Sequence, residues 1–116
     1  MPILKTVDFP KLGVSVDFHI GQNAADNFDL IDAADPHHLW FHVAGQSSCH
    51  VIAAIPNTFD RKEIRYIVKQ GAVLCKQHSS CASQKNISIT YGRVCDVQKT
   101  VIIGTVIVQN LKTVCI

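Results

Sequence analysis

Residues 39–55 of this 116-residue chain are LWFHVAGQSSCHVIAAI, two apolar runs on either side of a short polar segment. The runs cover residues 39–43 and 50–55, and the segment between them contains Gly45 and two serines. Short apolar runs bounded by turn-forming residues are typical of β-strands. The stretch therefore predicts an antiparallel pair of strands joined by a polar loop.

The sequence before this stretch predicts another strand pair and a short helix. Residues 14–20 alternate apolar and polar side chains, as a half-buried strand does. Leu4–Asp8 lie across a turn from them and are the expected hairpin partner. Asn23 is a suitable N-cap for a helix over Ala24–Ala33, because its side chain can accept a hydrogen bond from the first turn.

The sequence after this stretch predicts one long helix and then three strands. Thr58 or Asp60 can cap a helix from about Arg61 to His78. Its apolar residues share one arc, which contains Ile64, Ile67, Val68, Gly71, Ala72, Leu74 and Cys75. Three β-rich runs follow: Ile87–Tyr91, Val101–Val108 with Gly104 as a candidate bulge, and Leu111–Ile116.

Together these elements predict an α+β domain. Strands dominate both ends of the chain, and the two helices are inserted among them. We expect an antiparallel or mixed β-sheet packed against one long and one short helix, with both helices on one face. The length of the chain and its 47% hydrophobic content suit a single domain over residues 1–116.

The apolar runs, the N-terminal residues and the cysteines of the sequence indicate the compartment in which we expect the protein. No apolar run approaches the roughly 18 residues needed to cross a bilayer, and the N-terminal residues lack the pattern of a secretory signal. The five cysteines include no CxxC pair, which favours reduced structural thiols over a disulfide framework or a zinc knuckle. We therefore expect a cytoplasmic protein with no membrane partner and no cofactor.

Charge is distributed unevenly along the chain, although the formal net charge is only +2. Residues 1–58 hold six acids against two lysines, a net charge of −4, whereas residues 59–116 hold nine basic residues against three acids, a net charge of +6. A basic stripe on the long helix predicts a surface for a polyanion, and a merely solvated helix face is the alternative. The candidate nucleic-acid-binding residues are Arg61, Arg65, Lys69 and Lys76 on the helix and Lys85, Arg93 and Lys99 in loops.

Residue types suited to catalysis or metal binding gather in the central strand pair. His42 and His50 lie near each other if the strands pair, but a metal needs three or four ligands and no others lie nearby in sequence. Ser47 and Ser48 do not lie in the GxSxG elbow that presents a serine nucleophile. The sequence also shows no acidic residue that would orient a histidine as a general base. Residues 21–23 precede a helix and could present N–H groups to a phosphate, although a strand end plus a cap is the simpler interpretation. We expect no enzyme.

Five short motifs occur in the order and spacing of the NFACT-R domain. They are Gly21-x-Asn23, Asn27-x-Asp29, Trp40-Phe41-His42, Ser48-Cys49-His50-Val51 and Ile89-Thr90-Tyr91. From about residue 14 to residue 108 the chain resembles this domain, which occurs in ribosome quality-control factors and in small stand-alone proteins, and it is more similar to the stand-alone branch. The resemblance implies a non-catalytic RNA-binding module. It further implies that Gly21, Asn23, Trp40, His42, Ser48 and His50 belong to the family's shared surface or to its scaffold.

The leading hypothesis is therefore a module that binds RNA, either tRNA or ribosomal RNA, with DNA as a competitor. The resemblance leaves open whether the ribosome is a partner. The synthesis of tails on stalled chains belongs to the large factors of the family, and we do not extend that activity to this domain. The first alternative is a protein-interaction or self-associating module that uses the β-rich residues 101–116. The second is a metal-dependent hydrolase centred on His42 and His50. The oligomeric state is left open.

Overall fold

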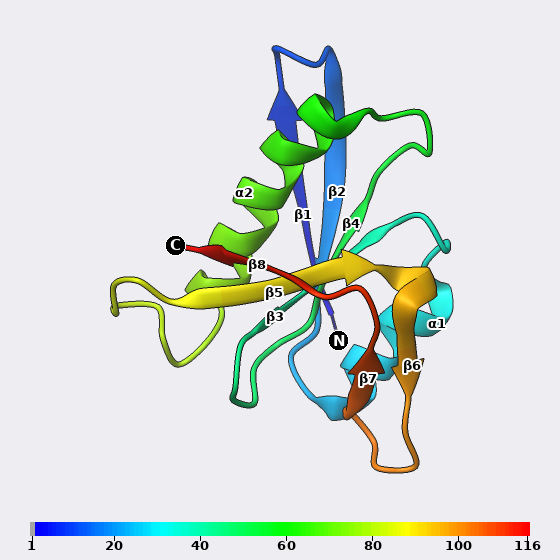
Figure 1. Cartoon of the computed structure of the whole chain (residues 1–116), viewed down its shortest axis with the longest axis vertical. Coiled ribbons are helices and arrows are strands. Elements are labelled where there is room, and N and C mark those ends of the chain that lie inside the picture. Colours follow the sequence, from blue (N-terminus) through cyan, green and yellow to red (C-terminus); the bar gives the residue numbers. More distant parts are fainter. Residues whose placement is uncertain (1) are drawn as a thin grey trace.

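The computed structural model describes residues 2–116. In chain order the elements are β1 (Ile3–Phe9), β2 (Val14–Ile20), α1 (Ala24–Ala33), β3 (Leu39–Val43), β4 (Val51–Ala54), α2 (Arg61–Gln77), β5 (Ser88–Arg93), the short 3-10 helix η1 (Val94–Asp96), β6 (Val97–Lys99), β7 (Val106–Val108) and β8 (Lys112–Cys115). Six strands form one antiparallel sheet in the order β1-β2-β4-β3-β5-β8, and β6 pairs with β7 in a separate hairpin (Figure 1). The predicted α+β class is confirmed.

Both predicted strand pairs are present. Strand β1 pairs with β2 along its whole length, from Ile3 opposite Ile20 to Phe9 opposite Val14. Strand β3 pairs with β4, so that Trp40 lies opposite Ile52. Strand β4 also pairs with β2, and β3 also pairs with β5. The residues 39–55 that decide the fold therefore form the centre of the sheet.

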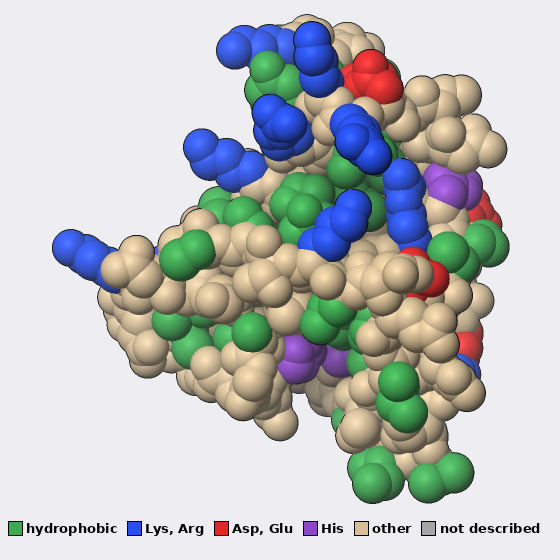
Figure 2. Space-filling view, in the orientation of Figure 1, with side chains coloured by type: hydrophobic (Ala, Val, Ile, Leu, Met, Phe, Trp, Pro, Cys, Tyr) green, Lys and Arg blue, Asp and Glu red, His purple; other side chains and the backbone are tan. Residues whose placement is uncertain are grey.

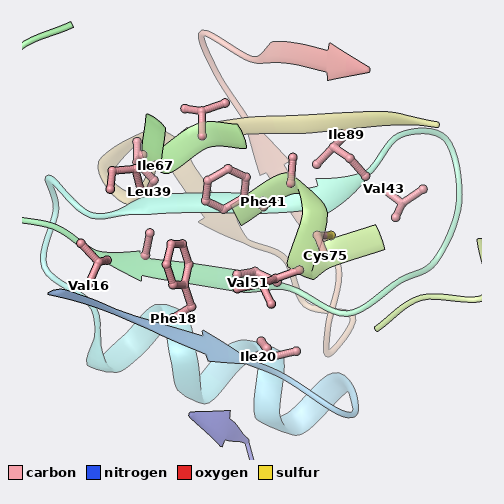
Figure 3. Close-up of a cluster of buried hydrophobic side chains, with 14 of the residues drawn as sticks. Val16, Phe18, Ile20, Leu39, Phe41, Val43, Val51, Ile67, Cys75 and Ile89 are labelled. Atoms are coloured by element: carbon pink, nitrogen blue, oxygen red, sulfur yellow. The ribbon is translucent and has the colours of Figure 1, made fainter. Parts of the chain in front are cut away.

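Helix α2 covers one face of the sheet. Ile67 and Cys75 of this helix are fully buried against side chains from β2, β3 and β4. Phe18, Phe41 and Val51 point into this core from three neighbouring strands (Figure 3). The arc of apolar residues predicted for the helix is its buried face, with Ile64 at the partly buried margin.

Helix α1 covers the opposite face, so the expectation that both helices lie on one face was wrong. Leu30 and Ile31 of α1 pack against Trp40 and Ile52 in a second core, together with valines of the β6–β7 hairpin. Successive residues of a strand point to opposite faces. Because β3 and β4 are apolar on both faces, each face of the sheet must be covered.

Side-chain caps fix where both helices begin. The side chain of Asn23 accepts a hydrogen bond from the backbone N–H of Asp26 at 2.8 Å, which confirms the predicted cap of α1. Asp60 caps α2 through a reciprocal pair of bonds with Glu63, at 2.9 and 3.0 Å. Asp60 is therefore the cap, and Thr58 is not.

The prediction of one strand over Val101–Val108 was wrong in its first half. The N–H of Thr100 donates to the carbonyl of Thr105, which closes a loop between β6 and β7. Gly104 lies in this loop with φ +82°, a conformation that favours glycine, and a Cβ there would come within 2.7 Å of Ala24. The glycine therefore makes a turn instead of a bulge, and the β-propensity of the apolar residues beside it is overridden.

Two further expectations concern membranes and thiols. Within residues 2–116, no helix is long and apolar enough to cross a membrane. All five cysteines are free, with Cys75 and Cys81 buried and Cys95 and Cys115 exposed. The prediction of reduced structural thiols therefore fits the two buried cysteines, Cys75 and Cys81, best.

Candidate nucleic-acid interface

A groove of about 810 Å³ lies between α2 and the strand pair β5–β8. The pairing of Tyr91 with Lys112 and the two-residue period of strands place Tyr91, Lys112 and Val114 on the face that α2 covers. Apolar residues form the floor, among them Leu39 and Val114. The ring of Tyr91 is half-buried there and stacks on Phe41, with centroids 6.0 Å apart.

Basic side chains from three elements line this groove. Arg61, Arg65 and Lys69 recur every four residues along α2, so all three lie on one exposed side of the helix. Arg93 joins them from the end of β5, and Lys112 joins them from β8. Figure 2 shows lysine and arginine side chains gathered over the part of the surface where α2 lies in Figure 1.

The charge of the groove is strongly positive. Five basic residues line it against one acid, Asp96, whose Oδ1 accepts a hydrogen bond from the amide of Asn110 at 3.4 Å. The guanidinium of Arg93 donates to the carbonyl oxygen of His37, which fixes its position at the end of the groove. The basic groove is defined by Arg61, Arg65, Lys69, Arg93 and Lys112.

Three of the basic residues predicted from sequence lie outside the groove. Lys76 donates to the carbonyl of Ile116 at 3.3 Å, near the other end of α2. Lys85 is exposed in the loop that follows α2. Lys99 forms an ion pair with Asp32 of α1 and lies 5.3 Å from the ring of Phe28, on the other side of the sheet. Its charge is therefore already paired.

Lys112 is the groove residue that sequence reasoning missed. It begins β8 and lies two residues before Val114, so the alternation of that strand places both side chains on the α2 face. The signal was present in the β-rich run at residues 111–116. Its meaning depended on knowing that β8 pairs with β5, and no local pattern gives that pairing.

Most of the motif residues form a hydrogen-bonded scaffold between the sheet and α1. The indole N–H of Trp40 donates to Nδ1 of His50 at 3.1 Å, and both side chains are buried. The backbone N–H of His50 donates to Oδ1 of Asn27 at 3.1 Å, and its carbonyl accepts from the N–H of Gly21 at 2.9 Å. Gly21 must lack a side chain, because a Cβ there would lie 2.0 Å from Oδ1 of Asn27.

Two other motif residues also bond within the chain. Asn23 caps α1, and Oδ2 of Asp26 accepts from the N–H of Gln22 at 3.1 Å, so side chains of the chain itself already occupy this helix start. Ser48 Oγ accepts from the N–H of Val43 at 3.0 Å and donates to the carbonyl of Cys49 at 2.9 Å. The geometry therefore supports neither a phosphate at residues 21–23 nor a nucleophile at Ser48.

His42 is one of three accessible residues among the six that the resemblance assigns to the family's surface or scaffold: it is half-buried, as is Ser48, and Asn23 is exposed. The ring of His42 lies parallel to that of Trp40, at 4° and 5.7 Å between centroids, and 5.1 Å from the ring of His50. Burial lowers the pKa of His42, and burial together with His42 lowers the pKa of His50 to about 3. Both rings are therefore neutral near pH 7.

A metal centre at these histidines lacks a third ligand. Within residues 2–116, the group of three side chains close enough to share an ion is Asp35, His37 and His38, which precede β3. Sequence reasoning did not single out these three residues. Neither His42 nor His50 belongs to that group, so the geometry gives the hydrolase alternative no support.

Known proteins share this architecture. Residues 15–109 match the family described as the NFACT protein RNA binding domain. Among solved structures, the chain is similar to the C-terminal part of the fibronectin/fibrinogen-binding protein from Streptococcus suis, with a TM-score of 0.74 and 20% identity over 87% of this chain. This chain spans 40% of the length of that structure. Among curated proteins, none matches the sequence significantly.

Proposed function

The chain belongs to the NFACT-R family of RNA-binding domains, and from this premise we propose that it binds RNA through the basic groove. The observation that carries the proposal is the convergence of five basic side chains from α2, β5 and β8 on one hollow. Lysine and arginine contacts to phosphates supply most of the affinity of backbone-binding proteins. A strand of RNA lying along the groove would place its phosphates between Arg65 and Lys112.

The chemistry of the groove suits a sugar-phosphate backbone. Arginine can contact a phosphate through two parallel hydrogen bonds, and three of the five basic residues are arginines. The floor between them is apolar, and the half-buried Tyr91 there can pack against a ribose. Contacts of this kind position RNA without identifying its bases.

The class of RNA is the finer part of the proposal. We assign tRNA or ribosomal RNA as the ligand, in keeping with the resemblance that the sequence motifs carry. A groove that reads mainly phosphates also accepts DNA to some degree, so duplex DNA is the expected competitor. The ribosome is a partner only insofar as its RNA reaches this groove.

The proposal is tested by fluorescence anisotropy with labelled tRNA, a single-stranded RNA and a DNA duplex, each titrated at several salt concentrations. We expect RNA to bind most tightly, with the logarithm of the affinity falling linearly against the logarithm of the salt concentration. The double substitution Arg65→Ala/Lys69→Ala should weaken binding and flatten that slope, since it removes two phosphate contacts.

The matched control is Lys5→Ala/Lys85→Ala, which removes the same charge at exposed positions outside the groove. It should leave both the affinity and the slope close to wild type. Equal losses in the two double variants would mean that overall charge, and not the groove, governs binding. No binding of any nucleic acid at low salt would reject the proposed function altogether.

A second candidate function is self-association through the tip of the β6–β7 hairpin. Val101, Ile102 and Ile103 are exposed by 103%, 65% and 58%, which is unusual for three consecutive large apolar residues. A second copy of the chain could cover this tip. Light scattering over a range of concentrations tests it, and the change Ile102→Ser should abolish any dimer. A monomer at every concentration would reject it.

A further inference from the structure

A second hollow lies on the sheet face opposite the basic groove. It has a volume of about 390 Å³ and lies between the β3–β4 loop and the β6–β7 hairpin. Its lining includes His42 and Thr90 from the sheet, Ser47 from the loop, and Thr105 and Leu111 from the hairpin and the segment after it. We propose that this hollow, the base pocket, receives one unpaired base of the RNA strand whose phosphates lie in the basic groove.

An aromatic column forms one wall of the base pocket. The rings of Trp40 and His42 are parallel, and their separation of 5.7 Å is that of offset stacking. Trp40 is buried, whereas His42 is half-exposed at the hollow. A base stacked on His42 would extend the column by one ring, which is the usual way in which proteins hold an unpaired base.

The charge of the base pocket selects a base over a phosphate. None of the described residues that line it is lysine, arginine, aspartate or glutamate, and its two histidines have lowered pKa values. An anion would therefore lack a counter-charge there, whereas a neutral flat heterocycle would not. The basic groove has the opposite character, so the two hollows suit the two chemically different parts of a nucleotide.

Hydrogen-bonding groups stand where the edge of a base would lie. Ser47 and Thr105 are exposed, and their hydroxyls bond to no other described residue. A hydroxyl can both donate and accept, so this pair can serve the edge of more than one base. Thr90 Oγ1 donates to the backbone carbonyl of His42 at 3.0 Å, which joins this side chain of β5 to the backbone of β3.

The two hollows meet at the start of β8. Leu111 lines the base pocket, and the next residue, Lys112, lines the basic groove. In Figure 1 the segment before β8 crosses β5, from the hairpin toward the α2 side. A strand that follows the basic groove therefore reaches the base pocket by passing this segment. The inference thus rests on the proposed function.

The test uses a short single-stranded oligouridylate and an abasic strand of equal length and charge. Trp40 is the only tryptophan in the chain, so its fluorescence reports on the base pocket. Wild type should bind the oligouridylate about tenfold more tightly than the abasic strand, as expected for one stacked base. Only the oligouridylate should change the emission of Trp40.

Variants separate the two sites. His42→Ala should bind both strands equally, with wild-type affinity for the abasic strand, whereas His42→Phe retains a ring and should retain the difference. Arg65→Ala/Lys69→Ala should weaken both strands by the same factor. A thermal melt of each variant verifies folding, and the comparison of the two strands on wild type stands without any variant.

The outcomes distinguish failure of the base pocket from failure of the basic groove. Equal affinity of wild type for both strands, with unchanged Trp40 emission, overturns the base pocket and leaves the basic groove intact. Binding of the oligouridylate alone supports the base pocket and contradicts the basic groove. Absence of binding by either strand at low salt overturns both.

Discussion

Trp40 and His50 are joined by a buried hydrogen bond, in which the indole N–H donates to Nδ1 of the imidazole across 3.1 Å. Nδ1 can accept only when it carries no proton, so the bond requires a neutral His50 with its proton on Nε2. The lowered pKa of His50, about 3, is consistent with that state. One bond in the core thus depends on the protonation of one ring.

Removing the donor tests the strength of this bond. Trp40→Phe leaves Nδ1 of His50 without its partner and should lower the free energy of unfolding by about 1–3 kcal/mol, in addition to the loss of packing. Urea denaturation of the variant, and of the same change in a His50→Leu background, separates the two terms. Equal losses in both backgrounds would show that only packing matters.

The pKa of His50 predicts a dependence of stability on pH. Between the ordinary value of 6.5 and the folded value of about 3, the unfolded chain binds the proton and the folded chain does not. Stability is therefore full above pH 6.5 and falls as the pH falls, by up to ~1.4 kcal/mol per pH unit. The lowered pKa of His42 acts in the same direction.

The variant His50→Asn isolates this effect, because Oδ1 of asparagine can accept the bond from Trp40 without binding a proton. Urea denaturation at pH 7 and pH 5 should show that the variant loses less stability than wild type. Exposed carboxylates titrate in both proteins and cancel in the comparison. Identical losses would mean that His50 is not held neutral by the fold.

A glycine at the join of β2 and α1 gives a packing prediction. Gly21→Ala would bring a Cβ to 2.0 Å from Oδ1 of Asn27 and displace the side chain that accepts from His50. We expect a loss of about 1–3 kcal/mol in unfolding free energy, as for other overpacked sites. Gly92→Ala is the control, since its Cβ would meet Val108 at an ordinary 3.7 Å. Similar melting temperatures for both variants would contradict this prediction.

The start of α2 gives a prediction about capping. Asp60→Ala removes an acceptor for the N–H of Glu63 and should cost about 1 kcal/mol of stability, visible as a lower melting temperature. Thr58→Ala should have little effect, because Thr58 is exposed and does not cap the helix. The reverse order of the two effects would place the cap at Thr58.

Lys112 gives a prediction about RNA. If its ammonium contacts one phosphate, Lys112→Ala should reduce the slope of log affinity against log salt by roughly 0.7–0.9, with a uniform loss across RNA sequences. Lys85→Ala, at an exposed loop position outside the groove, should leave the slope unchanged. Anisotropy titrations of both variants with tRNA check this, and an unchanged slope for Lys112→Ala would remove β8 from the interface.

Local features of the fold could be predicted from the sequence because their signals are local. Helix α1 begins and ends where the sequence places it, since Asn23 caps it within one turn. The buried face of α2 follows from the 3.6-residue period of its apolar residues. The pairing of residues 39–43 with 51–54 follows from two apolar runs and a short loop.

The rest depended on contacts between distant residues. Helix α1 covers the sheet face that carries Trp40 and Ile52, because Leu30 and Ile31 pack against these two side chains. The sequence near α1 does not show which face of β3 and β4 this is. Lys99 is separated by 67 positions from Asp32, the acid that pairs with it, so its removal from the candidate interface could not be foreseen. Lys112 enters the basic groove only because β8 returns to pair with β5.

The β6–β7 hairpin is closed at its base, because the N–H of Gln109 donates to the carbonyl of Asp96 at 3.0 Å. The chain thus leaves the sheet after β5 and re-enters it before β8 at nearly the same place. The β5–β8 ladder fixes its own register, so the length of this detour is not constrained by the sheet. The loop over residues 100–105 at the tip of this detour can therefore change in length without shifting the register of β8, so the wall that carries Lys112 stays in place.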